Sequence, residues 1–329
     1  MAKIYHLKGN FHFPRGDVET CINYHEKSLT FAKKIADPEL EASALGGLGD
    51  AAYAQGKMYS AYDYLRRCLQ CCQTHGLQHI EAPNLFMLGT VRIYQNQFQQ
   101  ALEDTLRAIQ LAQRVGHKRA EIVARLTVGW IYLDALRLTE AAEHVEAGIA
   151  LAHEIGAQRF VPFLEESQAR LAFYRREHVQ AQTIIADALN KVETLRAESF
   201  IGPWLLGTQA LVADDMAFGE RRIARGQQLL AQGCIGHNYF RFHVAAMEFG
   251  IRHQRPDIIA RHQESLAQFT KMEATPWSDF YINRAGLIVG AMQGEVVDDD
   301  RRQRLLNQGQ ESGLISALAA LEDMSLDEA

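Results

Sequence analysis

The sequence is poor in proline and cysteine, with 7 and 5 of these residues in 329. Few helix-breaking prolines leave room for long helices along the whole chain. Three of the cysteines, Cys68, Cys71 and Cys72, lie too close together on one predicted helix for a disulfide framework, and the total is odd. A metal site at Cys68 and Cys71 would need a second pair of ligands, and none is obvious. We therefore expect reduced thiols and no bound metal.

The sequence also lacks a surplus of basic residues and a long apolar run. Its 34 Lys and Arg are scattered and face 40 Asp and Glu, for a formal charge of −6. Binding to a nucleic-acid backbone needs a basic surface, so we expect no nucleic-acid partner. No apolar run approaches the roughly 18 residues of a membrane-spanning helix, and the first residues lead directly into an amphipathic helix. We expect a soluble cytoplasmic protein without a membrane partner.

Motifs of catalysis are missing as well. We find no phosphate-binding loop, zinc-protease motif or nucleophile elbow. The segment 47–52 loosely matches a dinucleotide-binding fingerprint, but that fingerprint must follow a strand, whereas Gly49 is expected inside a helix. Glu165 and Glu166 are the nearest candidate acid/base pair, yet neighbours on a helix point about 100° apart. We expect a protein that is not an enzyme and has no cofactor.

What the sequence does contain is a repeat. Three columns of small residues recur every 40 residues, and a column of larger aliphatic residues follows directly after the third. The columns are Gly9, Gly49, Gly89, Gly129 and Ala169; Cys21, Ala61, Ala101, Ala141 and Ala181; Ser28, Cys68, Ala108, Gly148 and Ala188; and Leu29, Leu69, Ile109, Ile149 and Leu189. Because four columns keep one spacing over five units, the repeat determines the architecture.

Each unit predicts two closely packed antiparallel helices. The first two columns lie 12 residues apart, which places one small residue on each of two successive helices. Gly16-Asp17 supplies a turn and a helix cap between them, and Asp37-Pro38-Glu39 opens the next unit. Gly76, Gly116 and Gly156 fall where the second helix should end, a position that favours glycine in the left-handed conformation.

These features resemble the tetratricopeptide repeat. Leu7-Lys8-Gly9-Asn10, Gly16-Asp17, Cys21 and Ser28-Leu29 follow its Leu-Gly, Gly, Ala and Ala-Leu positions, although the period is 40 rather than about 34 residues. The resemblance implies an all-α fold, a right-handed α-α superhelical solenoid of tetratricopeptide-like helical hairpins. We expect five regular repeats over 1–198, two degenerate repeats over 199–294, and a capping helix over 301–324 with an acidic tail within 295–329.

The same family places the first helix of each unit on the concave face, and the residue after the column glycine points into it. By this analogy we predict that a partner or ligand contacts Asn10, Asp50, Thr90, Trp130 and Arg170. Asp134 and Tyr174, four residues further along two of these helices, extend the same wall, and Trp204 of a degenerate repeat is the eighth predicted contact. Aromatic residues interleaved with polar ones are typical of a groove for a peptide or a small ligand. For Phe13, Tyr53 and Phe173, packing between repeats is an equally good interpretation.

A more particular resemblance involves the segments 41–51, 81–85, 200–205 and 236–242. They are similar to the C-terminal repeat region of large bacterial adenylate cyclases that carry a cyclase domain and a signalling ATPase domain upstream. The resemblance implies a regulatory or sensor module that recognises a protein or peptide, including a cyclase or ATPase domain in cis or in trans. The alternative is a small-molecule-sensing repeat domain that controls a signalling or transcription protein. A compact cavity walled by Trp130, Phe173, Tyr174 and Trp204 would indicate that alternative.

Overall fold

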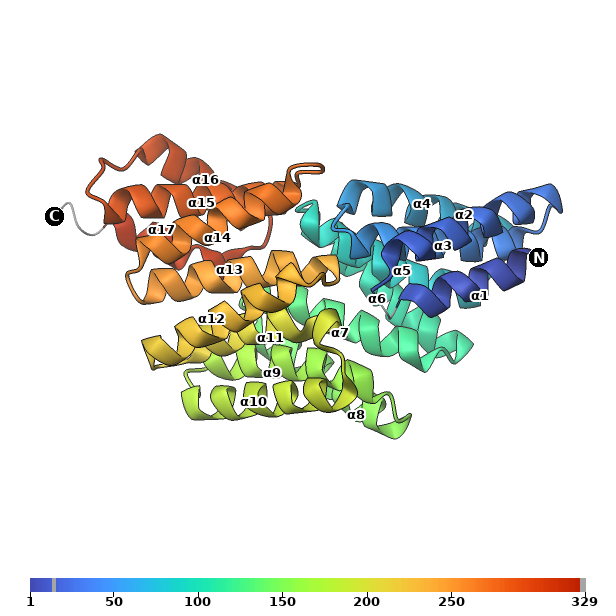
Figure 1. Ribbon diagram of the computed structural model, residues 1–329, viewed down its shortest axis with the longest axis horizontal. Coiled ribbons are helices and arrows are strands. Elements are labelled where there is room, and N and C mark those ends of the chain that lie inside the picture. The colour runs from blue at the N-terminus through green and yellow to red at the C-terminus, as the bar shows by residue number, and fades with distance from the viewer. Residues whose placement is uncertain (14–15, 326–329) are drawn as a thin grey trace.

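The computed structural model describes residues 1–13 and 16–325 of the chain. Within these ranges the secondary structure consists of α-helices and short 3-10 turns, without a strand (Figure 1). The predicted all-α, tetratricopeptide-like solenoid is therefore confirmed. The last four residues of the expected acidic tail, Leu326 to Ala329, lie outside the described residues.

The first ten helices form five antiparallel pairs. The pairs are α1 (Ala2–His12) with α2 (Val18–Lys34), α3 (Pro38–Ala54) with α4 (Met58–His75), α5 (Gln78–Tyr94) with α6 (Phe98–Val115), α7 (Lys118–Asp134) with α8 (Leu138–Glu154), and α9 (Val161–Tyr174) with α10 (His178–Leu195). A 3-10 turn, η2 (Gln158–Phe160), precedes α9. Helix starts at 38, 78 and 118 and at 58, 98, 138 and 178 reproduce the 40-residue period.

Turns between these helices share one backbone feature: a residue in the left-handed conformation every 20 residues from position 16 to position 196. Glycine occupies half of these positions, and the predicted left-handed Gly76, Gly116 and Gly156 have φ angles of 69°, 71° and 67°. The other positions, Ala36, Asn96, Leu136, Arg176 and Arg196, adopt φ angles of 52° to 64° although each carries a side chain. A left-handed non-glycine residue costs about 1–2 kcal/mol. Packing of the helix pairs therefore imposes the turn where glycine is absent.

Small residues of the first column let the two helices of a pair approach closely, as predicted. A Cβ atom at Gly89 would lie 2.2 Å from Thr105 Oγ1, and one at Gly49 would lie 2.7 Å from Leu65 Cγ. The predicted caps form too: the Asp37 carboxylate accepts a hydrogen bond from the Leu40 amide at 3.0 Å, with Pro38 in the first turn. The small residues and the helix caps in the sequence thus favour the same helix pairs that form in the structure.

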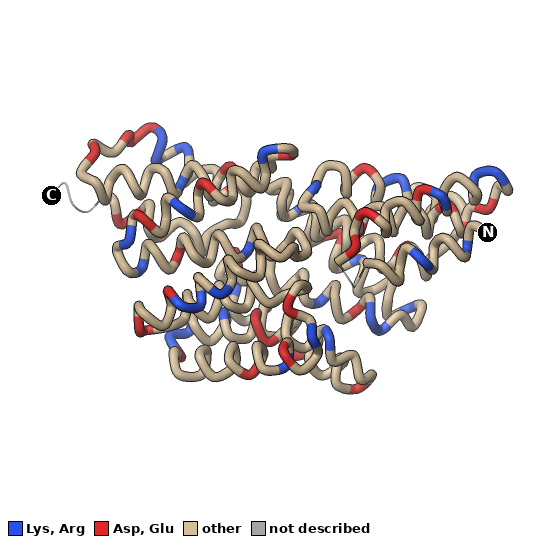
Figure 2. Tube along the Cα trace, in the orientation of Figure 1, with Lys and Arg blue, Asp and Glu red and all other residues tan. Residues whose placement is uncertain are grey.

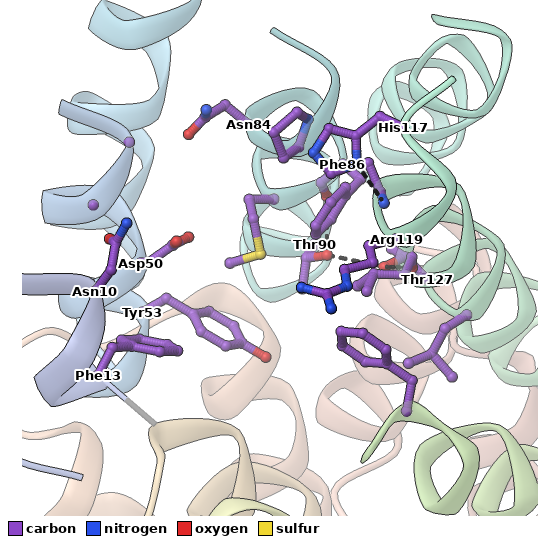
Figure 3. A pocket seen from close by; sticks show the side chains of 18 of the residues that line it. Asn10, Phe13, Asp50, Tyr53, Asn84, Phe86, Thr90, His117, Arg119 and Thr127 are labelled. Carbon is purple, nitrogen blue, oxygen red and sulfur yellow. Dashed lines mark hydrogen bonds between the residues drawn. The ribbon is translucent and has the colours of Figure 1, made fainter. Parts of the chain in front are cut away.

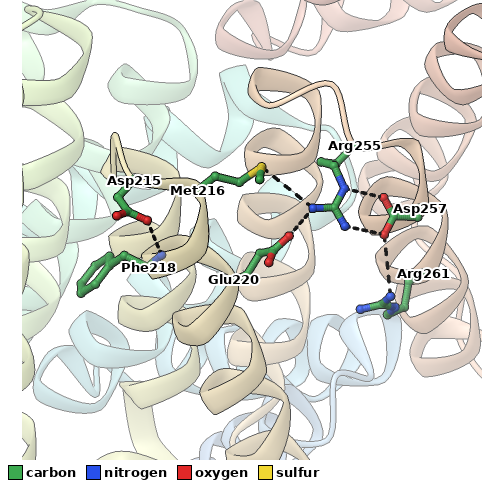
Figure 4. Close-up of polar contacts among 7 residues, drawn as sticks. All are labelled: Asp215, Met216, Phe218, Glu220, Arg255, Asp257 and Arg261. Carbon is green, nitrogen blue, oxygen red and sulfur yellow. Dashed lines mark hydrogen bonds and ion pairs between the residues drawn. The ribbon is translucent and has the colours of Figure 1, made fainter.

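The later part of the chain continues with α11 (Glu198–Val212), α12 (Met216–Ala231), α13 (Gly236–Arg252), α14 (Pro256–Thr270) and α15 (Pro276–Met292). Starts of α12 and α14, and of α13 and α15, are again 40 residues apart. Figure 4 shows how α12 and α14 are joined by Arg255, which pairs with Glu220 and donates to Asp257 Oδ1 at 2.8 Å. These groups are exposed or partly exposed, so the link contributes little to stability.

Helices α13 and α15 return to the N-terminal half of the chain, where α13 packs on α3 and α15 on α5. At the start of α13 a Cβ on Gly236 would lie 2.5 Å from Gly56 N. Burial lowers the pKa of His237 to about 4, so this ring is neutral. Its Nε2 lies 2.7 Å from the Phe200 carbonyl oxygen, and its Nδ1 lies 3.2 Å from the Tyr53 hydroxyl. The superhelix therefore closes across its own concave face.

The expected single helix over 301–324 is wrong. Helix α16 (Asp299–Glu311) ends before Gly313, whose φ of 67° turns the chain. The following η3 (Ile315–Ala317) lies against α7, and the short α17 (Ala319–Glu322) and η4 (Asp323–Ser325) complete the described chain. Leu314, Leu318 and Leu321 are buried. This segment packs into the concave face because its leucines find apolar neighbours there.

Charged residues of both signs are scattered over the helices, as Figure 2 shows. This distribution matches the scattered Lys and Arg noted in the sequence. In the described part of the chain no helix is both long and apolar enough to pass through a membrane.

Candidate functional site

The concave face contains two cavities of about 500 and 310 Å³. The first lies between α1, α3, α5, α7 and the η2 turn, with the start of α13 at its edge. The second lies between α7, α9, α11, α13 and α15, and the C-terminal segment 316–323 contributes to its wall. Both volumes fall in the range of about 300–1,000 Å³ that is typical of ligand sites.

The eight predicted contact residues are divided between these cavities. Asn10, Asp50, Thr90 and Trp130 line the first. Asp134, Arg170, Tyr174 and Trp204 line the second. The structure therefore brings them together in two groups of four and not along one continuous groove.

The floor of the first cavity is apolar. Phe86 and Met87 of α5, Val123 and Leu126 of α7, and Phe163 of α9 supply it. Thr90 belongs to the wall itself: its hydroxyl donates to the Phe86 carbonyl and lies 3.0 Å from the Thr127 hydroxyl (Figure 3). Side chains of a ligand would find apolar contacts here, with polar groups at the walls.

Asp50 is the carboxylate of this first cavity. In Figure 3 it lies with Asn10 on one wall, and no ion pair or hydrogen bond holds its carboxylate among the described residues. Burial without a partner raises the pKa of Asp50 to about 7. At neutral pH this residue is thus an acceptor whose ionised form lacks a counter-ion.

We predict that Asp50→Asn stabilises the protein at pH 8. The folded-state pKa of Asp50 lies above the value of an unfolded aspartate, so stability falls as the pH rises from about 4 to about 7, and the loss is complete above that pH. Asn does not ionise, and its gain should be about 1–3 kcal/mol at pH 8 after allowance for partial exposure. At pH 4 the gain should vanish, because Asp50 is then protonated in the folded protein.

Urea unfolding at both pH values measures this effect. Asp187→Asn, on an exposed position of α10, is the matched control and should change neither value. An Asp50→Asn effect that is the same at pH 4 and pH 8 would exclude the titration of Asp50 as its cause.

The opposite wall of the first cavity is basic. His117 and Arg119 stand on it in Figure 3, and His79 and Arg159 also line the cavity. The sequence interpretation missed this wall. The sequence does contain a pattern that indicates this wall: His79, Arg119 and Arg159 are spaced by 40 residues at the starts of successive inner helices.

A buried ion cluster lines the second cavity. Arg170 Nη2 donates to Asp134 Oδ1 at 2.8 Å, and Arg241 Nη1 donates to Asp134 Oδ2 at 3.3 Å. Burial alone would raise the pKa of Asp134, but the guanidinium groups of Arg241 and Arg170 outweigh it and lower this pKa. Asp134 is therefore ionised, and its charge is balanced within the protein.

Aromatic rings surround the Arg241 guanidinium. Its carbon lies 5.4 to 5.9 Å from the ring centres of Tyr94, Trp130, Trp204 and Trp277. Trp130 and Trp204 also contact each other and are 4% and 2% exposed. Four predicted contact residues, Trp130, Asp134, Arg170 and Trp204, thus hold this cluster together, and their part in recognition stays a prediction.

The remaining side chains that could take part in catalysis or metal binding lie apart from one another. Glu165 pairs with Lys191, whereas the buried Glu166 accepts a hydrogen bond from the Thr208 hydroxyl at 2.8 Å. Cys68 is fully buried, and its contact with Cys72 and its burial raise the pKa of its thiol. In the ranges that the structure describes, no three His, Cys, Asp or Glu side chains are grouped as a metal site would require.

Comparison with solved structures shows the same fold in three other proteins, two of which were solved with a bound peptide. The Rap conjugation gene regulator of plasmid pLS20, solved with a Phr peptide, has a TM-score of 0.63 at 13% identity, over 97% of this chain and 98% of that one. NprR with its cognate peptide NprX has a TM-score of 0.55 at 13% identity, over 86% of both chains. The apo form of RapI has a TM-score of 0.54 at 12% identity, over 89% and 98%. Identities this low establish similarity of fold alone.

Comparison with curated protein sequences gives no match. A family model does match: the MalT-like TPR region, over residues 2–211. This range spans the five predicted repeats from residue 2 onward and all but the last residue of α11, and it covers more than half of the chain. The chain is therefore a tetratricopeptide repeat protein, and it belongs to the MalT-like TPR region family.

Proposed function

We propose that this protein is a non-catalytic regulatory scaffold that senses a peptide, or a peptide segment of a protein, in the first cavity. The observation that carries the proposal is the cavity itself, about 500 Å³ of concave space with an apolar floor between two polar walls. A peptide can place side chains on such a floor while its backbone bonds to the walls. The pLS20 Rap regulator and NprR, which share the fold, were each solved with a peptide.

Regulation of another domain is the second part of the proposal. The sequence resemblance to the repeat region of bacterial adenylate cyclases favours a cyclase or ATPase domain, in cis or in trans, as the recipient of the signal. Within this proposal residues 1–198 form the sensing repeats, 199–294 close the superhelix and 295–329 cap it, in the cytoplasm. Binding of a peptide at the concave face would stabilise one curvature of the repeats.

Peptide capture tests this function. Val123→Trp enlarges a half-buried residue of the first cavity, so we expect it to reduce capture from a random peptide pool at least about tenfold. Val179→Trp makes the same change at a position that is 80% exposed on α10 and should leave capture unaltered. Capture by the unmodified chain and both variants is measured by mass spectrometry of the retained peptides. Equal retention by Val123→Trp and Val179→Trp would contradict a site in this cavity.

Small-molecule sensing is the second candidate, and the second cavity favours it. Its volume is about 310 Å³, and it is lined by three of the four aromatic residues expected for this alternative, Phe173, Tyr174 and Trp204. Glu166 Oε2 and Arg241 Nη2 are buried there without a hydrogen-bond partner among the described residues. A thermal-shift screen of metabolites tests this candidate, since a ligand that binds the folded protein raises its melting temperature. A screen without any stabilising compound would count against it.

A further inference from the structure

The two walls of the first cavity carry charges of opposite sign. We infer that the bound peptide is zwitterionic, with a carboxylate at Arg119 and Arg159 and an ammonium or guanidinium group at Asp50. This inference rests on the proposed function and specifies the ligand of the same site.

Arg119 and Arg159 are cations that the protein leaves without a carboxylate partner in its described part. Acids near them in sequence are already engaged: Glu121 pairs with Arg125 at 2.7 Å, and Glu154 pairs with Lys118. The Arg159 guanidinium lies over the Phe160 ring, 4.7 Å from its centre, which fixes the position of its charge. Burial, and then the charge of Arg119, lower the pKa of Arg159. Two guanidinium groups that repel each other at a cavity wall are a site for an anion.

Asp50 lies on the opposite wall of the first cavity. Figure 3 shows Asp50 and Asn10 facing the cavity opposite Arg119 and His117. The Asp50 carboxylate has neither an ion pair nor a hydrogen bond within the described chain, although its neighbours Gly49 and Ala51 are fully enclosed. A carboxylate held in this way gains a counter-ion only from a ligand that brings a positive charge.

Asn84 lies between the walls and adds a group for a peptide backbone. Its Nδ2 donates to the Ile80 carbonyl at 2.7 Å, and this bond leaves Oδ1 as an acceptor. The apolar floor below it suits side chains. Separated opposite charges with an amide acceptor between them match a short peptide better than a lone inorganic anion, because an anion would leave Asp50 without a partner.

End-group chemistry of synthetic peptides tests the inference. A pentapeptide pool with uncharged side chains is prepared with free ends, with an acetylated N-terminus, with an amidated C-terminus, and with both ends blocked. A further pool has both ends blocked and carries Lys, Arg, Asp and Glu side chains. Retention is measured by mass spectrometry on the full-length chain and on the variants Asp50→Asn and Arg119→Gln/Arg159→Gln. Arg114→Gln/Arg304→Gln, at two exposed positions outside the cavity, is the control.

On the unmodified chain, blocking either end should reduce retention about tenfold, the value of one charge-assisted contact. Retention by the Arg119→Gln/Arg159→Gln variant should no longer depend on a free C-terminal carboxylate. Retention by Asp50→Asn should no longer depend on a free N-terminal amine. Retention of blocked peptides that contain both a basic and an acidic side chain would equally support the inference and assign the charges to side chains. Retention that ignores end groups and side-chain charges would overturn the inference and leave the peptide-sensing function intact. No retention of any pool would overturn that function, and the inference with it.

Discussion

Replacing Asp134 with Ala should lower the free energy of unfolding by about 3–5 kcal/mol, the largest effect we expect from a single substitution. The Asp134 side chain is 2% exposed and accepts hydrogen bonds from Arg170 and Arg241. Its removal leaves two buried guanidinium groups without the carboxylate that they share. Arg241 cannot escape to water, because four aromatic rings and the closing helices enclose it.

Asp63→Ala is the matched control for this experiment. Asp63 also contacts two arginines, Arg66 and Arg67, each at 3.4 Å, but its side chain is 54% exposed on α4. An exposed pair contributes at most about 1 kcal/mol, so this variant should stay near the unmodified stability. Urea unfolding of the two variants measures the difference. Similar losses for Asp63→Ala and Asp134→Ala would mean that the buried cluster does not hold the superhelix closed.

Gly236→Ala should destabilise the protein by about 1–3 kcal/mol. The added Cβ would lie 2.5 Å from Gly56 N and 2.7 Å from the Tyr53 carbonyl oxygen. Both are backbone atoms, one in the last turn of α3 and one in the α3–α4 turn, so no side chain can rotate away to make room. The start of α13 would have to move away from α3, which would lengthen the hydrogen bond between the Tyr53 hydroxyl and His237 Nδ1.

Gly202→Ala separates this contact from the general effect of adding a methyl group to a helix. There the Cβ would meet the Leu229 side chain at 3.2 Å, and a small rotation of that side chain can accommodate it. We therefore expect little loss, or a gain of up to about 1 kcal/mol from helix propensity. The same unfolding measurement compares both variants. If the two variants have the same free energy of unfolding, the position of α13 does not depend on the close contact of Gly236 with Gly56 and Tyr53.

The repeats were predictable because their determinants are local. Column glycines, the Asp37-Pro38 helix start and the glycines at 76, 116 and 156 act within one or two helices, and the structure confirms each of them. The left-handed turns at Leu136 and Arg176 were not predictable, because neither residue type signals this conformation. Packing between helix pairs, which a single sequence does not display, imposes them.

Closure of the superhelix could not be predicted from the sequence either. Tyr53 and His237 lie 184 positions apart, and no periodicity relates α3 to α13. The repeat register identified the inner-facing residues, but closure divided them between two cavities and turned Asp134 and Arg170 toward each other. Arg119 and Arg159 could not be assigned to the concave face from the repeat, because they lie at helix starts and outside the position after the column glycine.

Hydrogen–deuterium exchange tests the central claim, peptide sensing in the first cavity, most directly. The peptide that the unmodified chain retains best is added to the full-length protein, and amide exchange is compared with and without it. We predict slower exchange in the inner helices α3, α5 and α7, whose residues line this cavity, and no change in the outer helices α4, α6 and α8. Slower exchange confined to the outer helices, or to the later helices α11 to α16, would contradict the claim.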